Sequence, residues 1–174
     1  MHPGPAHHPV WSVYDEQRTA RLNVRYLQRE LARLKFVDRW SEILVAVATT
    51  SSVGSFWVLQ TLIGGAIWKT AGAIAVVVSI VRPILRLSDR IQEKEKLLTG
   101  YSVLDHDLHC ICIEIRHARK YDNSLHKEFV SAMNRKAELI KTNSASPVDE
   151  KLLKKCEALV ILELPAESFF IPES

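Results

Sequence analysis

Residues 43–68 have the sequence ILVAVATTSSVGSFWVLQTLIGGAIW, and none of these 26 residues carries a formal charge. After Lys69, a further 12 uncharged residues follow before Arg82. A helix of roughly 20 apolar residues crosses the ~30 Å hydrocarbon core of a bilayer. The stretch therefore predicts a transmembrane hairpin over 43–85, with spans at about 43–62 and 66–85 and a turn at Gly64–Gly65.

The average composition hides this stretch. The chain has 174 residues, 25% of them charged, a net charge of +3 and a mean hydropathy of -0.01, which are values typical of a soluble globular domain. Yet only Lys69 and Arg82 are charged between residues 43 and 85. The alternative to a membrane hairpin is a helical hairpin buried inside a soluble bundle.

Basic residues flank the uncharged stretch on both sides. Cytoplasmic segments next to membrane spans are enriched in Lys and Arg, so the pattern predicts a multi-pass protein with both termini cytoplasmic and the lipid bilayer as a partner. The first 17 residues contain no Lys or Arg, so we expect no cleaved signal peptide. The cations before and after the stretch are Arg18, Arg21, Arg25, Arg29, Arg33, Lys35 and Arg39, then Arg86, Arg90, Lys94 and Lys96.

The remaining sequence predicts helices and no strands. We expect a flexible tail over 1–13, an Arg-rich amphipathic cytoplasmic helix over 14–42, a cytoplasmic helical region over 86–164 and a tail over 165–174. The predicted fold class is all-α: a two-helix transmembrane hairpin with a cytoplasmic helical bundle or coiled coil. In the first helix, arginines spaced by 3, 4, 4 and 4 residues form one stripe, for which we favour a solvated or lipid-headgroup-facing role over a phosphate site: Arg18, Arg21, Arg25, Arg29 and Arg33.

Apolar residues beyond the hairpin alternate by 4 and 3, which predicts a coiled-coil seam of nearly three heptads. This cytoplasmic seam comprises Leu97, Tyr101, Leu104, Leu108, Ile111 and Ile115. It can pack on another helix of the same chain or on an identical neighbour. Gly100 is expected to mark a kink before the seam, and Ser146 is expected to cap the last helix, with Pro147 at its first position.

Polar and small residues inside the hairpin suggest two roles. Thr49, Ser52 and Gln60 fall in one sector of the first span and are the hypothetical lining of a pore; packing between the two spans is the alternative. Lys69 and Arg82 lie near opposite ends of the second span, where their side chains can reach the interface. Helix packing is predicted at the small residues Ala71, Gly72, Ala73 and Ala75.

No catalytic, cofactor or nucleotide-binding motif is present in the sequence. We therefore expect no enzyme, no catalytic residue and no cofactor. A cluster of possible metal ligands comes from one short segment, and zinc sites usually combine two segments, so we expect a polar helix face and no metal. The cluster is Asp105, His106, Asp107, His109, Cys110 and Cys112. Basic and acidic residues nearly balance outside the uncharged stretch, so no nucleic-acid partner is expected.

The layout resembles the SLATT group, the bacterial two-transmembrane effector domains of nucleotide-signalling conflict systems. The similarity covers about 14–140 and rests on the Arg-rich helix with Arg25–Tyr26, the turn at Gly64–Gly65 and the long charged helix that follows. It implies an antiviral defence effector of the bacterial inner membrane that oligomerises with its own copies and forms a pore or disrupts the membrane. A nucleotide second messenger or an upstream sensor protein would activate it. The alternative is a membrane-anchored helical scaffold or signalling adaptor without pore activity.

Overall fold

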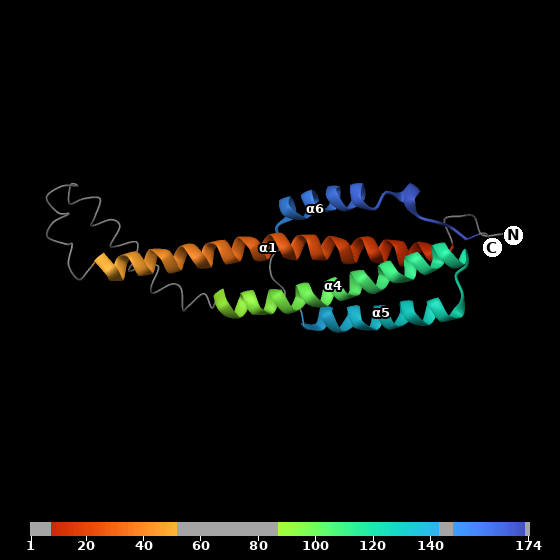
Figure 1. The fold of residues 1–174 in the computed structure, drawn as a ribbon, viewed down its shortest axis with the longest axis horizontal. Helices are drawn as coiled ribbons and strands as arrows, with labels where there is room; N and C mark the ends of the chain where they lie inside the picture. Colours follow the sequence, from red (N-terminus) through yellow and green to blue (C-terminus); the bar gives the residue numbers. More distant parts are fainter. Residues whose placement is uncertain (1–7, 52–86, 143–147, 173–174) are drawn as a thin grey trace. The chain divides into compact units, whose positions relative to one another are not determined.

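The computed structural model describes residues 8–51, 87–142 and 148–172, and these ranges are helical with connecting turns. They contain the helices α1 (Val10–Ser51), α4 (Leu87–Ala118), α5 (Asn123–Thr142) and α6 (Glu150–Glu163), and a 3-10 helix, η2 (Ala166–Ser168) (Figure 1). No strand occurs in the described ranges. The all-helical part of the predicted fold class agrees with the structure.

The membrane part of the prediction does not agree. Within the described ranges, no helix is both long enough and apolar enough to cross a bilayer. This finding contradicts the predicted integral membrane fold class, the multi-pass localisation in the bacterial inner membrane, and the membrane and pore-forming roles. In α1, only 43–51 belongs to the uncharged stretch, and these residues extend a helix that is rich in charge before them. Most of the predicted hairpin, 52–85, lies outside the described residues.

The chain divides into two compact units. The bundle unit comprises Met1–Arg29 and Glu95–Ser174, and therefore holds the first part of α1, most of α4, and all of α5 and α6. The second unit is Glu30–Lys94, of which the rest of α1 and the first turns of α4 are described.

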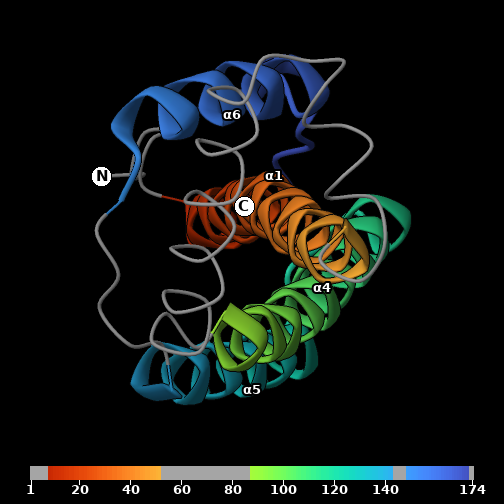
Figure 2. The ribbon, with the colours of Figure 1, turned by 90° about the vertical axis from the view of Figure 1, so that its left-hand side faces the viewer.

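The core of the bundle unit lies where α1, α4 and α5 meet. In this unit α1 lies between α6 and α4, with α5 on the far side of α4 (Figures 1 and 2). Each fully buried Leu or Ile contributes about 1.5–3 kcal/mol of hydrophobic stabilisation. All six residues of the predicted seam are buried here, against residues of the same chain that include Val10, Val13, Tyr14, Ala20, Val24 and Leu27 of α1. The seam therefore packs within the chain.

The ends of the helices follow from local hydrogen bonds. α1 starts at Val10, before the predicted boundary at residue 14, because Val10 and Val13 are buried in the core and the Val10 N–H is bonded to His8 Nδ1. Before α5, the Asp122 carboxylate accepts bonds from the backbone N–H groups of Ser124 and Leu125, as an N-cap does. α6 is capped by Asp149, three residues after the predicted Ser146, which lies outside the described residues with Pro147.

Gly100 is a point of close approach between two helices. α4 runs from Leu87 to Ala118 and continues through Gly100, where a kink was expected, without a break in the helix. A Cβ placed on Gly100 would lie 2.3 Å from Cδ2 of Leu139 in α5. The glycine thus lets the Leu139 side chain fill the space beside the α4 backbone.

Candidate functional site

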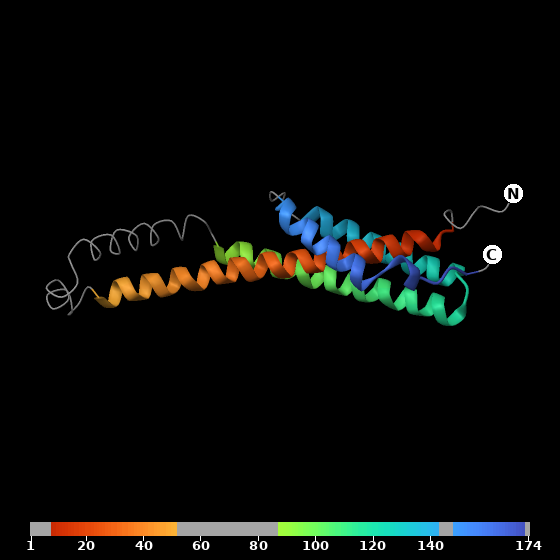
Figure 3. The ribbon, with the colours of Figure 1, turned by 90° about the horizontal axis from the view of Figure 1, so that it is seen from above.

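The arginine stripe of α1 contacts other parts of the same chain. Arg18 donates from Nε and Nη2 to the carbonyl oxygen of Leu164, at 3.0 and 2.7 Å. Arg25 Nη2 lies 2.7 Å from Oε1 of Glu163. Leu164 is the C-cap of α6, and cations are favourable beside the carbonyl groups that end a helix. Arg18 and Arg25 therefore fix the end of α6 on α1, which α6 crosses in Figure 3.

The chain after α6 is attached to α1 and α4 by aromatic and polar contacts. The ring of Tyr14 stacks on Phe169 with centroids 4.1 Å apart, and the Tyr14 hydroxyl donates to the Phe170 carbonyl oxygen at 2.6 Å. The Arg18 guanidinium lies 4.9 Å from the centroid of the Phe169 ring, and Arg116 Nη2 donates to the Ser168 carbonyl oxygen at 3.0 Å. Burial raises the pKa of Tyr14 to about 12, so the hydroxyl keeps its proton. We call residues 149–172 the C-terminal segment.

Arg21, on the same stripe, contacts α4 instead of α6. Its Nε lies 3.1 Å from each carboxylate oxygen of Asp105, which is only 8% exposed. Burial raises the pKa of Asp105, although the Arg21 guanidinium acts in the opposite direction. One turn away, Gln17 is 1% exposed and its Nε2 lies 3.1 Å from Nδ1 of His109. Gln17, Arg21, Asp105 and His109 form the polar cluster between α1 and α4.

The other two arginines of the stripe, Arg29 and Arg33, are exposed. Two kinds of contact are therefore seen along the stripe: the C-terminal segment at Arg18 and Arg25, and the buried carboxylate at Arg21. At Arg18 and Arg25 an anion would have to replace a carbonyl oxygen and a carboxylate of the chain itself.

The three cysteines have different surroundings. Cys110 is exposed, with Sγ 3.7 Å from Nε2 of His106, whereas Cys112 and Cys156 are buried. Burial raises the pKa of Cys112 to about 12, so this residue is a neutral thiol and not a reactive thiolate. Among the residues that the structure describes, no three His, Cys, Asp or Glu side chains are grouped as metal ligands.

Several predicted site residues cannot be placed from the structure. Thr49 lies in the last turns of α1 without a described side chain. The other pore and helix-packing residues lie outside the described residues: Ser52, Gln60, Lys69, Arg82, Ala71, Gly72, Ala73 and Ala75.

Two features of the site were absent from the sequence-based prediction. The C-terminal tail, predicted over 165–174, is part of the packed structure through Phe169 and Phe170. Two adjacent aromatic residues near a chain end are the sequence signal for such packing, because large apolar side chains gain most from burial. The second feature is Gln17, whose burial follows from its place between the core residues Val13 and Ala20 of α1.

Comparison with known proteins gives no relative: no family model, no curated protein and no solved structure matches this chain. The resemblance to the SLATT group therefore stays a prediction. What the site can do is inferred from its contacts alone. Its guanidinium groups hold a carboxylate and a carbonyl oxygen of the C-terminal segment, and an anion with similar oxygens can compete for them.

Proposed function

We propose that the chain is a signalling adaptor without catalytic activity, in which the C-terminal segment leaves its place on α1 when a phosphate-bearing ligand binds. The observation that carries this proposal is that two arginines of the stripe already bind groups of the C-terminal segment. Arg18 and Arg25, which were expected to face solvent or lipid headgroups, instead hold Leu164 and Glu163. The segment thus occupies the groups that would bind the signal.

Two of the polar contacts that hold the segment are exposed, so a competing ligand can replace them. The Arg25 and Glu163 side chains are 39% and 34% exposed, and exposed ion pairs contribute about 0–1 kcal/mol. The backbone N–H of Asp149 donates to Tyr26 Oη at 3.1 Å, and this hydrogen bond is exposed too. A ligand with several phosphate oxygens can offer bidentate contacts to two guanidinium groups at once. It competes with the exposed ion pair of Arg25 and with the two hydrogen bonds of Arg18 to one carbonyl oxygen.

The apolar attachment of α6 is separate from the core of the bundle unit. Its buried side chains are Leu152, Cys156 and Val160, and none of these three belongs to the core cluster of α1, α4 and α5. Removing α6 from α1 would therefore leave that core cluster intact. In the segment, Phe169 and Phe170 do pack against the core cluster, so the separation supports a change of place by α6 while the rest of the bundle keeps its fold.

The resemblance to the SLATT group supports the choice of ligand. That resemblance implies activation by a nucleotide second messenger or an upstream sensor protein, and nucleotides carry the phosphates that a pair of arginines would bind. The adaptor would then pass the signal on by presenting the released segment, or the α1 surface beneath it, to a partner protein.

Cys156 provides a direct test, because its thiol lies on the buried face of α6 and becomes accessible only when the segment opens. The assay measures the labelling rate of Cys156 by a maleimide in the Cys110→Ser chain, which lacks the exposed thiol. ATP and a cyclic dinucleotide are added in turn, with sodium chloride at matched ionic strength as the control. We expect each effective nucleotide to accelerate labelling at least tenfold.

The variant Arg25→Gln tests whether this arginine both holds the segment closed and binds the nucleotide. Losing an exposed ion pair of up to about 1 kcal/mol should raise the basal labelling rate up to about fivefold, and the nucleotide effect should shrink. Arg29→Gln is the matched control, because Arg29 is an exposed arginine of the same stripe, and it should leave both rates near those of the parent chain. Labelling that neither nucleotide accelerates, and that Arg25→Gln leaves unchanged, would contradict the proposed function.

A further inference from the structure

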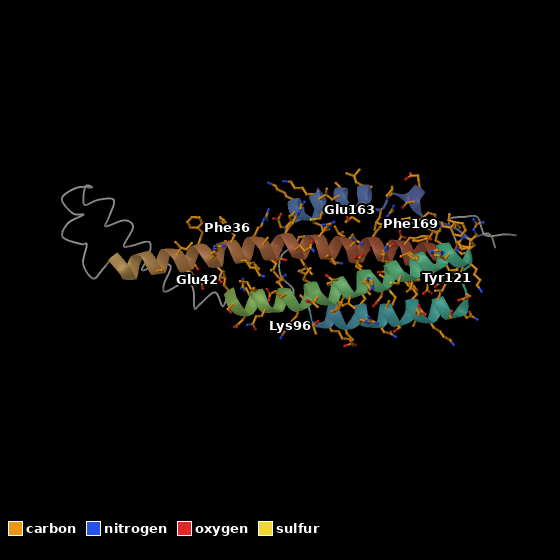
Figure 4. The ribbon with its side chains drawn as sticks, viewed as in Figure 1. Phe36, Glu42, Lys96, Tyr121, Glu163 and Phe169 are labelled. Atoms are coloured by element: carbon orange, nitrogen blue, oxygen red, sulfur yellow. The ribbon has the colours of Figure 1, made fainter. Side chains whose placement is uncertain are left out.

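His106 and Cys110 of α4 form a pair whose side chains are in contact on the surface of the bundle unit. Their Nε2 and Sγ atoms are 3.7 Å apart and both residues are exposed. The pair lies between Lys96 and Tyr121, which are labelled in Figure 4. The other four residues of the predicted ligand cluster are buried or bonded to side chains of α1 and α5. They are Asp105 with Arg21, His109 with Gln17, Asp107 with Arg135, and the buried Cys112.

The separation of the two atoms is close to that of two ligands on one zinc ion. Cysteine sulfur and histidine nitrogen bind structural zinc tetrahedrally, at about 2.3 Å and about 2.0 Å from the metal. These bond lengths and the tetrahedral angle place the two ligand atoms about 3.5 Å apart, near the 3.7 Å of the pair. Ligands four residues apart share one face of a helix, as the two zinc-binding histidines of an HExxH motif do. α4 therefore holds the two side chains near the geometry that one zinc ion requires.

One chain supplies half of the ligands that such a site needs. Structural zinc sites have four protein ligands, and the described residues contain no group of three His, Cys, Asp or Glu that could hold a metal. A second copy of this chain, related by a two-fold axis beside the pair, supplies the same two side chains again. The complete set is then two thiolates and two imidazoles, a combination typical of tetrahedral zinc.

The surface around the pair suits contact with another helix. Val103 and Ile113 are 44% and 40% exposed, and together with the pair they follow spacings of 3, 4 and 3 residues. At about 100° per residue these four positions fall within a sector of about 80°, on the side of α4 opposite the buried Leu104 and Leu108. Helices that pack side by side use this spacing. Two α4 helices that meet here cover apolar side chains on both sides of the metal.

We propose that His106 and Cys110 form half of a structural zinc site, which a second copy of this chain completes across a two-fold axis. On binding, each Cys110 thiol releases its proton to solvent and its sulfur bonds to the metal, while each His106 binds through an unprotonated Nε2. The two thiolates balance the charge of Zn²⁺, so the assembled site is neutral. The pair shares no residue with the arginines that hold the C-terminal segment, so a failure of this proposal leaves the proposed adaptor function untouched.

The test is a titration of the full chain with Zn²⁺ in the presence of a phosphine reductant, which prevents a Cys110 disulfide. A competing chromophoric chelator gives the stoichiometry, and sedimentation equilibrium gives the mass. We expect one zinc ion per two chains, and a monomer that becomes a dimer when zinc is added. Co²⁺ in place of zinc should give thiolate-to-cobalt charge-transfer absorption and the intense visible bands of a tetrahedral ion.

Substitutions of the pair test which residues bind the metal. Cys110→Ser and His106→Ala should each weaken zinc binding more than about 100-fold, which exceeds the cost of losing a contact that only supports a ligand. Both should also abolish the zinc-dependent dimer. His117→Ala is the matched control, because His117 is an exposed histidine of the same helix without a cysteine four residues away. It should leave zinc affinity and dimerisation unchanged, and circular dichroism should show that all three variants keep their helical content.

Four results would overturn the proposal. They are a chain that binds no zinc, one zinc ion on each monomer, a dimer that forms equally without zinc, and zinc binding that survives Cys110→Ser. The first two remove the shared site, because a two-fold site requires one metal between two copies. The last two show that contacts other than the pair hold the copies or the metal.

Discussion

Replacing Arg21 by Met tests whether the polar cluster between α1 and α4 stabilises the bundle unit. Methionine keeps a long apolar stem beside α4 but removes the guanidinium, so the Asp105 carboxylate loses its ion pair. Burial already raises the pKa of this carboxyl with Arg21 in place. The substitution therefore leaves a largely buried charge whose remaining surroundings favour its neutral form.

The expected loss follows from the exposure of the pair. Breaking a fully buried ion pair costs about 3–5 kcal/mol, whereas an exposed pair contributes about 0–1 kcal/mol. The side chains of Arg21 and Asp105 are 28% and 12% exposed, which places this pair between those limits. We expect Arg21→Met to lower the free energy of unfolding at neutral pH by about 2 kcal/mol, near the value for hydrogen bonds to charged groups.

The loss should depend on pH. A carboxyl whose pKa is higher in the folded chain than in the unfolded chain binds its proton more tightly when folded. Its stabilising contribution is full below the unfolded pKa of about 3.9 and disappears as the pH rises through the folded pKa. Without Arg21 the folded pKa of Asp105 rises further, so the difference between variant and parent should be small near pH 4 and reach its full size near pH 7.

Urea unfolding followed by circular dichroism at both pH values measures this difference. A loss of about 2 kcal/mol lowers the urea midpoint by about 1 M at a slope of about 2 kcal/mol per molar. The control is Arg21→Met in the Asp105→Asn chain: the amide does not ionise, so the stability difference from Asp105→Asn alone should not depend on pH. A loss below about 0.5 kcal/mol at pH 7, or an equal loss at both pH values, would refute the assigned role of the ion pair.

Three further predictions concern other parts of the bundle unit. In the parent chain, a maleimide should label Cys110 quickly at pH 8 and Cys112 only on unfolding, because burial raises the Cys112 pKa to about 12; rapid labelling of both would contradict the buried site. Gly100→Ala should destabilise the chain by about 1 kcal/mol, since overpacking outweighs the gain in helix propensity, and adding Leu139→Ala should remove this strain in a double-mutant cycle. Asp149→Ala removes the hydrogen bond from the Leu152 N–H to the α6 cap, so it should cost about 1 kcal/mol of α6 stability and raise the Cys156 labelling rate about fivefold; an unchanged rate would show that the cap does not limit opening.

Helical periodicity identified the parts of the fold that local sequence determines. The 4-3 spacing from Leu97 to Ile115 located the buried face of α4, because a helix must place those residues on one side. The same spacing left two packing partners possible, and only the structure showed that α1 and α5 of the same chain provide them. The run of charges before residue 43 also indicated a long helix, although its start at Val10 depends on tertiary burial of Val10 and Val13.

The uncharged stretch was less informative than its length suggested. Hydropathy shows how many uncharged residues follow one another, but it does not show where a helix begins. The first uncharged residues can be the last turns of a charged helix, as 43–51 are in α1. The transmembrane prediction assumed that the change in composition coincides with the start of a new helix. In the described structure, α1 continues across that point.

The arginine stripe shows why site residues are harder to predict than helices. A spacing of 3 and 4 places guanidinium groups on one face, but it does not say what lies opposite. The acceptors come from distant parts of the chain: Asp105 from α4, Glu163 from α6 and the Leu164 carbonyl oxygen from the α6 C-cap. Arginine carries the same charge whether its ligand is external or internal, so the stripe predicts anion binding in both cases. The groups that the arginines bind depend on which helix packs on α1. For α6, that packing depends more on the burial of Leu152, Cys156 and Val160 than on the arginines themselves.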